Sequence, residues 1–96
     1  MSLLIATLLY TGTVVAEENL QEKIKTLVRQ AARWSTAAKQ DENTMVAILH
    51  ANYGAGYLWA LKDIASDSQI VSATGINLDK FIKEIIKIQD MVTMRM

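Results

Sequence analysis

The feature that most constrains the fold is a run of eighteen residues, from position 44 to position 61, that contains no charged side chain: TMVAILHANYGAGYLWAL. A helix that avoids charge on every side is normally buried on every side. The run is not uniformly apolar, because it holds the only histidine, His50, together with Asn52, Tyr53 and Tyr57. We therefore expect it to form the central helix of the protein and to carry most of its unusual side chains.

The length and composition limit the classes of protein to which the chain can belong. The length of 96 residues predicts a single domain, 1–96, with one modest core. Hydrophobic residues make up 51% and charged residues 21%, so the chain is not intrinsically disordered. The formal net charge is zero, which gives no general attraction to nucleic acid. Cysteine is absent, which excludes disulfides and thiolate metal sites, and proline is absent, so long helices are not interrupted.

The first sixteen residues, MSLLIATLLYTGTVVA, are also uncharged. Val14 and Ala16 suit positions −3 and −1 of a signal-peptidase site, and residues 3–9 resemble the apolar part of a signal. The basic start of such a signal is missing. We therefore expect an integral helical segment, with a cleavable signal or an anchor at 1–16 as the alternatives. The compartment stays unassigned, with the cytoplasm favoured.

Helical spacing of apolar residues predicts the remaining elements. From residue 19 to 40, apolar and small side chains share one arc of roughly 120°, opposite the charged ones. Whether this helix, at about 14–40, continues from an apolar segment at about 2–11 is open, since Gly12 costs only about 1 kcal/mol inside a helix. Further helices are expected at about 42–66 and 78–94, with a short helical turn at 68–74.

The short polar turn at 39–43 predicts that the second long helix folds back antiparallel on the first. Counting outward from this turn places Ala31 near Ala51 and Ile24 near Leu58. Small side chains that recur every fourth residue favour a close approach of the two backbones, and they are Ala47, Ala51 and Ala55. The predicted fold is all-α: a small antiparallel bundle of three to four helices.

His50 is the first candidate for catalysis, because an imidazole beside phenols can move protons. On a helix it shares a side with Tyr53, Gly54 and Tyr57. However, no nucleophile stands at a recognisable position, and no carboxylate lies within one helical turn to orient the imidazole. We therefore predict that the protein is not an enzyme, and that His50 is buried and bonded to a tyrosine, an asparagine or a backbone carbonyl.

Motifs for metals, phosphates and nucleic acids are missing. The Glu-x-x-His pair of di-iron bundles would need glutamate where Ala47 stands, so we predict no metal and no cofactor. Residues 54–56, Gly-Ala-Gly, lack the preceding strand and following glycines of a phosphate-binding loop. A basic stripe adjoins Glu18 and Glu22 and is interpreted as a solvated face rather than a nucleic-acid site; it comprises Lys25, Arg29 and Arg33.

The chain carries more apolar surface than a small monomer can hide. Besides the two uncharged segments, the apolar side chains of helix 78–94 spread over about 160°, which is wider than one neighbour needs. Because large exposed apolar patches are avoided unless they bind something, we expect a homo-oligomer, a dimer or tetramer, that completes the bundle. The candidate interface residues are Tyr53, Gly54, Tyr57, Phe81, Ile85, Ile88 and Val92.

The function predicted from the sequence is a structural or protein-interaction module that self-associates through helix 44–61 and its apolar neighbours. One alternative is a helical module with a small-ligand pocket beside His50, Asn52, Tyr53 and Tyr57. The other is a membrane-associated or secreted protein. This reading is disfavoured because residues 44–61 reach only the lower limit of a span and carry their aromatic residues in mid-run.

Overall fold

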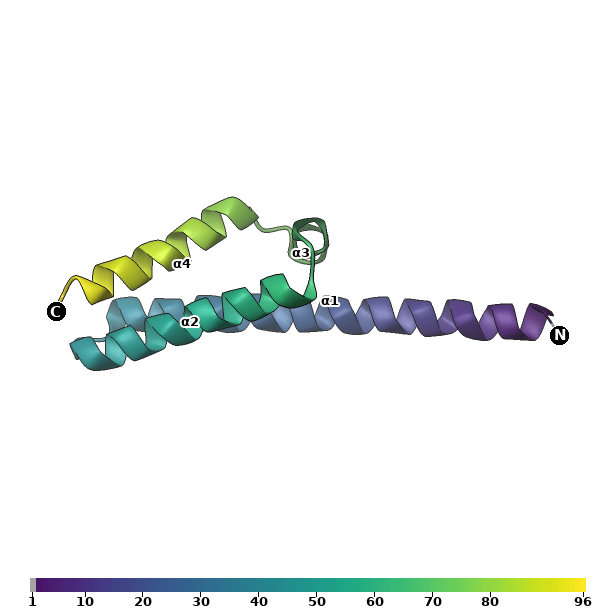
Figure 1. Cartoon of the computed structure of the whole chain (residues 1–96), viewed down its shortest axis with the longest axis horizontal. Coiled ribbons are helices and arrows are strands. Elements are labelled where there is room, and N and C mark those ends of the chain that lie inside the picture. The colour runs from purple at the N-terminus through teal and green to yellow at the C-terminus, as the bar shows by residue number, and fades with distance from the viewer. Residues whose placement is uncertain (1) are drawn as a thin grey trace.

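The computed structural model describes the backbone of residues 2–96 and the side chains of residues 18–96. Over that backbone the chain forms four helices and no strand, which confirms the all-α class: α1 (Ser2–Gln40), α2 (Thr44–Ile64), α3 (Asp67–Thr74) and α4 (Leu78–Thr93) (Figure 1). Helix α1 is continuous, with no break at Gly12. The alternatives of a signal or an anchor at 1–16 concern side chains that lie outside the described residues.

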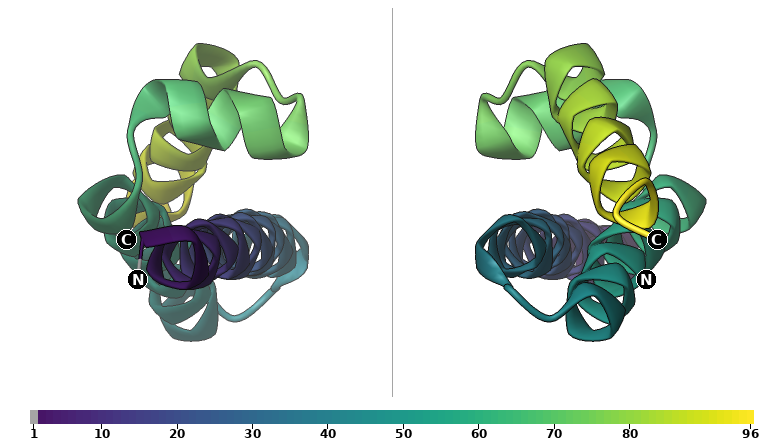
Figure 2. Two further views of the ribbon diagram at one scale, coloured as in Figure 1. Left: turned by 90° about the vertical axis from the view of Figure 1, so that its right-hand side faces the viewer. Right: turned by 90° about the vertical axis from the view of Figure 1, so that its left-hand side faces the viewer.

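The helices pack as a small bundle. Helices α1 and α2 lie side by side and antiparallel, and they form the most extensive contact in the molecule. Helices α3 and α4 both lie on one side of this pair (Figure 2). The opposite side of the α1–α2 pair has no helix of this chain against it. This one-sided arrangement determines which side chains of α2 remain at the surface.

Local chemistry at the helix ends sets where three of the helices begin. The side chain of Asn43 accepts a hydrogen bond from the backbone nitrogen of Val46 at 3.0 Å, which caps α2. Ser66 and Gln69 exchange hydrogen bonds in a capping box at the start of α3. Asn77 caps α4, after Gly75 has ended α3 in the left-handed conformation with φ of 72°.

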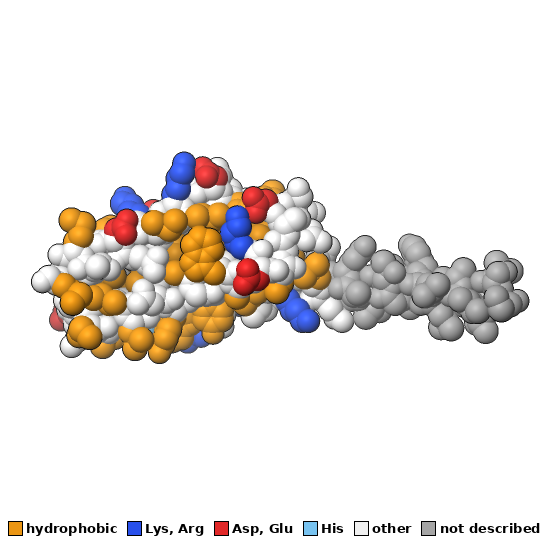
Figure 3. Space-filling model, in the orientation of Figure 1, with side chains coloured by type: hydrophobic (Ala, Val, Ile, Leu, Met, Phe, Trp, Pro, Cys, Tyr) orange, Lys and Arg blue, Asp and Glu red, His pale blue; other side chains and the backbone are white. Residues whose placement is uncertain are grey.

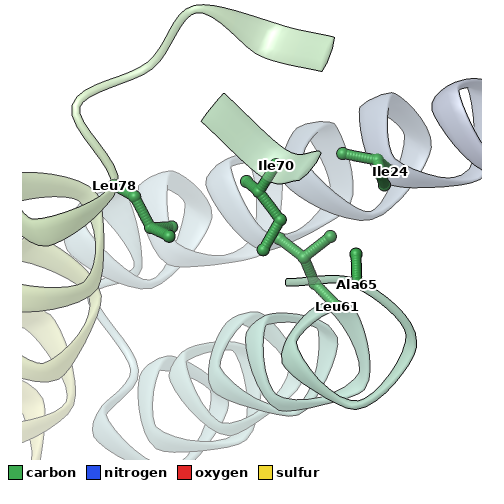
Figure 4. Close-up of a cluster of buried hydrophobic side chains, with 5 residues drawn as sticks. All are labelled: Ile24, Leu61, Ala65, Ile70 and Leu78. Atoms are coloured by element: carbon green, nitrogen blue, oxygen red, sulfur yellow. The ribbon is translucent and has the colours of Figure 1, made fainter. Parts of the chain in front are cut away.

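The core is a row of three clusters along the α1–α2 pair. At one end Ile24, Leu61, Ala65, Ile70 and Leu78 bring all four helices together, and Figure 4 shows their side chains pointing toward one another. The central cluster comprises Ala31, Ala55, Leu58 and Ile85. The cluster beside the α1–α2 turn comprises Ala38, Ala47, Ala51, Ile88 and Val92. Small residues dominate the α1–α2 seam, as the alanine ladder predicts.

The predicted register between α1 and α2 is wrong by about one helical turn. Ala31 packs with Ala55 rather than with Ala51, and Ile24 packs with Leu61 rather than with Leu58. The reason is the first turn of α2, where Met45 is 69% exposed and Ala47 is the first buried residue. The predicted register requires α2 to pack against α1 immediately after the loop.

Candidate interaction face on helix α2

One side of α2 has no partner within the described chain and is almost entirely apolar. We call it the outer face; it comprises Met45, Val46, Leu49, Asn52, Tyr53, Gly56, Tyr57, Trp59, Ala60 and Ile64, all of them exposed. Hydrophobic side chains gather along the lower edge of the molecule in Figure 3, where Figure 1 places α2. From Met45 to Ile64 the face extends about 29 Å at 1.5 Å per residue.

The outer face follows from helical periodicity. The residues that turn toward α1 and α4 recur every three or four positions and are small or apolar; they are Ala47, Ala51, Gly54, Ala55, Leu58 and Leu61. Because positions 44–61 carry no charge, the side opposite to these residues is apolar as well. Apolar surface of this extent is typical of an interaction site on a soluble protein.

A glycine forms the floor of a shallow depression in the outer face. The depression has a volume of about 460 Å³ and is lined by Trp34 of α1 and by Asn52, Tyr53, Gly56, Tyr57 and Ala60 of α2. Apart from Gly56 itself, its chain neighbours and the adjacent backbone of α2, no atom lies within 4 Å of the position that a Cβ on Gly56 would take. The space above Gly56 is therefore open to a side chain from outside.

A polar and aromatic cluster lies beside the outer face, at the turn between α1 and α2. The Nδ1 atom of His50 lies 2.6 Å from the Oδ2 atom of Asp41. The imidazole also lies against the rings of Trp34 and Tyr53, with centroids 5.0 and 6.0 Å away. Arg95, at the end of the chain, donates a hydrogen bond to the carbonyl oxygen of Asp41 at 2.7 Å. The cluster thus joins the turn, α2 and the C-terminus.

The carboxylate is the partner that the sequence prediction for His50 missed. A tyrosine, an asparagine or a carbonyl was expected, whereas Asp41 lies nine residues away, across the turn. The only signal was that Asp41 belongs to the polar turn at 39–43, and this does not reveal that its side chain reaches back to α2. Among the described residues His50 makes no hydrogen bond to a hydroxyl group, so the pair resembles a structural contact more than a nucleophile–base arrangement.

The predicted ligand residues separate in the structure. Asn52, Tyr53 and Tyr57 line the depression, whereas His50 does not and instead contacts Asp41. The side-chain oxygen of Asn52 accepts a hydrogen bond from Gln89 of α4 at 3.1 Å. A pocket built around all four side chains is therefore not formed.

The predicted interface residues also divide, and four of the seven are corrected. Tyr53 and Tyr57 are exposed on the outer face, and Phe81 is half-buried. Gly54 is buried against α1, where a Cβ would lie 3.0 Å from the backbone nitrogen of Ser35. The other three are core residues of α4 that pack on α1 and α2, because α4 folds over that pair: Ile85, Ile88 and Val92.

The basic stripe of α1 engages its own helix. Lys25 lies 3.5 Å from Glu22, and Arg29 donates to the hydroxyl of Thr26 at 3.4 Å. The guanidinium of Arg33 lies 5.3 Å from the ring centroid of Trp34. These contacts within the helix fit a solvated face.

Among the described residues, no group of three or more His, Asp or Glu side chains is placed to hold a metal ion. Within the same part of the chain, no helix has both the length and the apolar character needed to cross a bilayer. Comparison of the chain with protein-family models, with curated proteins and with solved structures gives no match. The function is therefore inferred from the geometry of this chain.

Proposed function

We propose that the chain is a non-enzymatic interaction module that self-associates through the outer face of α2. The observation that carries this proposal is the uncharged, exposed surface that runs along α2 from Met45 to Ala60 and ends beside Ile64 and the exposed Asp63. The proposed interface leaves out α4, because Ile85, Ile88 and Val92 of that helix are core residues.

The exposed area of the outer face is of the size that a stable dimer needs. Aromatic side chains bury roughly 150–250 Å² each when fully covered, and the large aliphatic ones lie at or below the lower end of that range. From their exposed fractions, the large apolar side chains of the outer face present on the order of 700 Å², close to the roughly 800 Å² per partner of a standard interface. A second copy of the chain offers a matching surface, which favours a twofold dimer.

The test is the molar mass of the full chain in detergent-free solution, measured by sedimentation equilibrium at micromolar concentration. We expect a dimer, and we expect Leu49→Glu to raise its dissociation constant at least about tenfold, because the interface would bury an unpaired charge. Val71→Glu is the matched control: Val71 is similarly exposed, but it lies on α3. A monodisperse monomer, or equal effects of the two variants, would contradict the proposal.

A second candidate function is the binding of a small apolar or aromatic ligand in the depression over Gly56. The observation that favours it is the convergence of Trp34, Tyr53 and Tyr57 around that glycine. Such a ligand should raise the melting temperature of the wild-type chain, and Gly56→Leu should abolish the shift by filling the depression. A screen of apolar and aromatic ligands in which none raises the melting temperature would remove this candidate.

A further inference from the structure

The outer face of α2 is graded in side-chain size along its length. Its N-terminal half carries the large residues Met45, Leu49 and Tyr53 along the midline. In the C-terminal half the midline positions are Gly56 and Ala60, with open space above Gly56. Tyr57, Trp59 and Ile64 flank this hollow part. A midline that is bulky in one half and hollow in the other fits a copy of itself best in one relative direction.

We propose that two copies pair their α2 helices antiparallel, about a twofold axis that passes midway between Tyr53 and Gly56; this rests on the self-association proposed above. Tyr53 then lies over the partner's Gly56, and Leu49 over the partner's Ala60. Met45 lies against the partner's Ile64. Tyr53 and Leu49 thus each meet a small residue, and the two helices approach closely along the central part of their contact.

A parallel pairing lacks this complementarity. It would place Tyr53 against the partner's Tyr53 and Gly56 against the partner's Gly56, so that bulky residues separate the helices where glycine leaves a void. Voids and overpacking both cost stability at an interface, as they do in a core. The size gradient therefore favours antiparallel over parallel pairing of the two α2 helices.

Charge favours the same direction. Asp63 is exposed at the C-terminal end of α2, beside Ile64. In the antiparallel pair its carboxylate lies near the N-terminus of the partner's α2, whose helix dipole attracts an anion. In a parallel pair it would face the partner's Asp63.

The experiment uses the absence of cysteine from the chain, which gives each single-cysteine variant one reactive thiol. Leu49→Cys and Ala60→Cys are prepared in the full chain, alone and as an equimolar mixture, and treated with a short bismaleimide. Antiparallel pairing predicts severalfold more cross-linked dimer from the mixture than from either variant alone. Ser72→Cys, exposed on α3 away from the outer face, is the control and should not cross-link to itself.

The outcomes separate this inference from the function on which it rests. Efficient cross-linking of each variant with itself would show a parallel pair and overturn the inference, while self-association through α2 would stand. A dimeric mass without cross-links in any combination would place the interface elsewhere and overturn both. A monomeric mass of the wild-type chain would overturn the proposed function itself.

Discussion

Two glycines of α2, Gly54 and Gly56, lie in opposite surroundings although only one residue separates them. Gly54 faces α1 so closely that a Cβ would contact the Oγ atom of Ser35 and lie 3.1 Å from the carbonyl oxygen of Ala31. Gly56 faces open space. The buried Ser35 hydroxyl has no hydrogen-bond partner in the described part of the chain. This fits a contact between α1 and α2 that depends on close packing of the two backbones rather than on polar contacts.

This difference predicts opposite effects of the same substitution. Gly54→Ala should lower the free energy of unfolding by about 1–2 kcal/mol, because overpacking exceeds the gain in helix propensity. Gly56→Ala should raise it by about 0.5–1 kcal/mol, since the methyl group meets nothing and the unfolded chain loses entropy. Urea denaturation at a concentration where the chain is monomeric measures both. Effects of the same sign would contradict the placement of α2.

The contact between Asp41 and His50 should contribute measurably to stability. Both side chains are largely shielded, with exposed fractions of 24% for Asp41 and 22% for His50. Water therefore competes less for this contact than for an ion pair at the surface. A double-mutant cycle of Asp41→Ala and His50→Ala should give a coupling energy of about 0.5–1.5 kcal/mol. The control cycle uses Asp79 and Lys83, 3.0 Å apart and mostly exposed, for which we expect at most about 0.5 kcal/mol. Equal couplings would show that burial adds nothing.

At the scale of elements, the attachment of α3 to the core depends on one side chain. It has eight residues, too few for a stable isolated helix, and Ile70 is its only buried residue. Ile70→Ala should lower the free energy of unfolding by about 2–4 kcal/mol, because it removes apolar volume where all four helices meet.

The same substitution should release α3 locally. Amide hydrogen exchange across residues 67–74 should lose its protection in Ile70→Ala, whereas the exposed Val71→Ala should change stability by less than about 0.5 kcal/mol. Retained protection in Ile70→Ala would mean that the capping box of Ser66 and Gln69 holds the helix by itself.

At the scale of the whole molecule, an apolar interface in a chain with zero net charge should respond weakly to salt. We expect the dissociation constant of the proposed dimer in 1 M NaCl to lie within about threefold of its value in 0.1 M, because little of the attraction is screened. Calorimetry of dilution should show the negative heat-capacity change of apolar burial on association. A loss of affinity of tenfold or more in high salt would indicate an electrostatic interface.

Much of the fold could be predicted because its signals are local. The period of apolar residues in α1 and the caps at Asn43 and Asn77 act within one or two turns of helix, so they can be recognised from the sequence without the tertiary structure. The short loop then requires α1 and α2 to lie antiparallel. The register failed by one turn because the first turn of α2 remains exposed, which no local pattern indicates.

The candidate site was less predictable, since it depends on which helices cover which faces. In α4 the wide apolar arc gave no sign that Ile85, Ile88 and Val92 are core residues, because a core face and an interface have the same composition. The partner of His50 was missed since Asp41 reaches it across a turn rather than along a helix.

The sequence by itself determined that residues 44–61 form a helix with no charged side, and that its alanines favour a close seam with α1. It did not determine which side of that helix stays outside, because a helix without charge has no polar face to mark its surface. The tertiary structure decided this through the size of the side chains on each side of α2 and through the helices that cover them. Small residues let α1 approach on one side, α4 closes over the seam, and the larger side chains from Met45 to Ile64 are left at the surface.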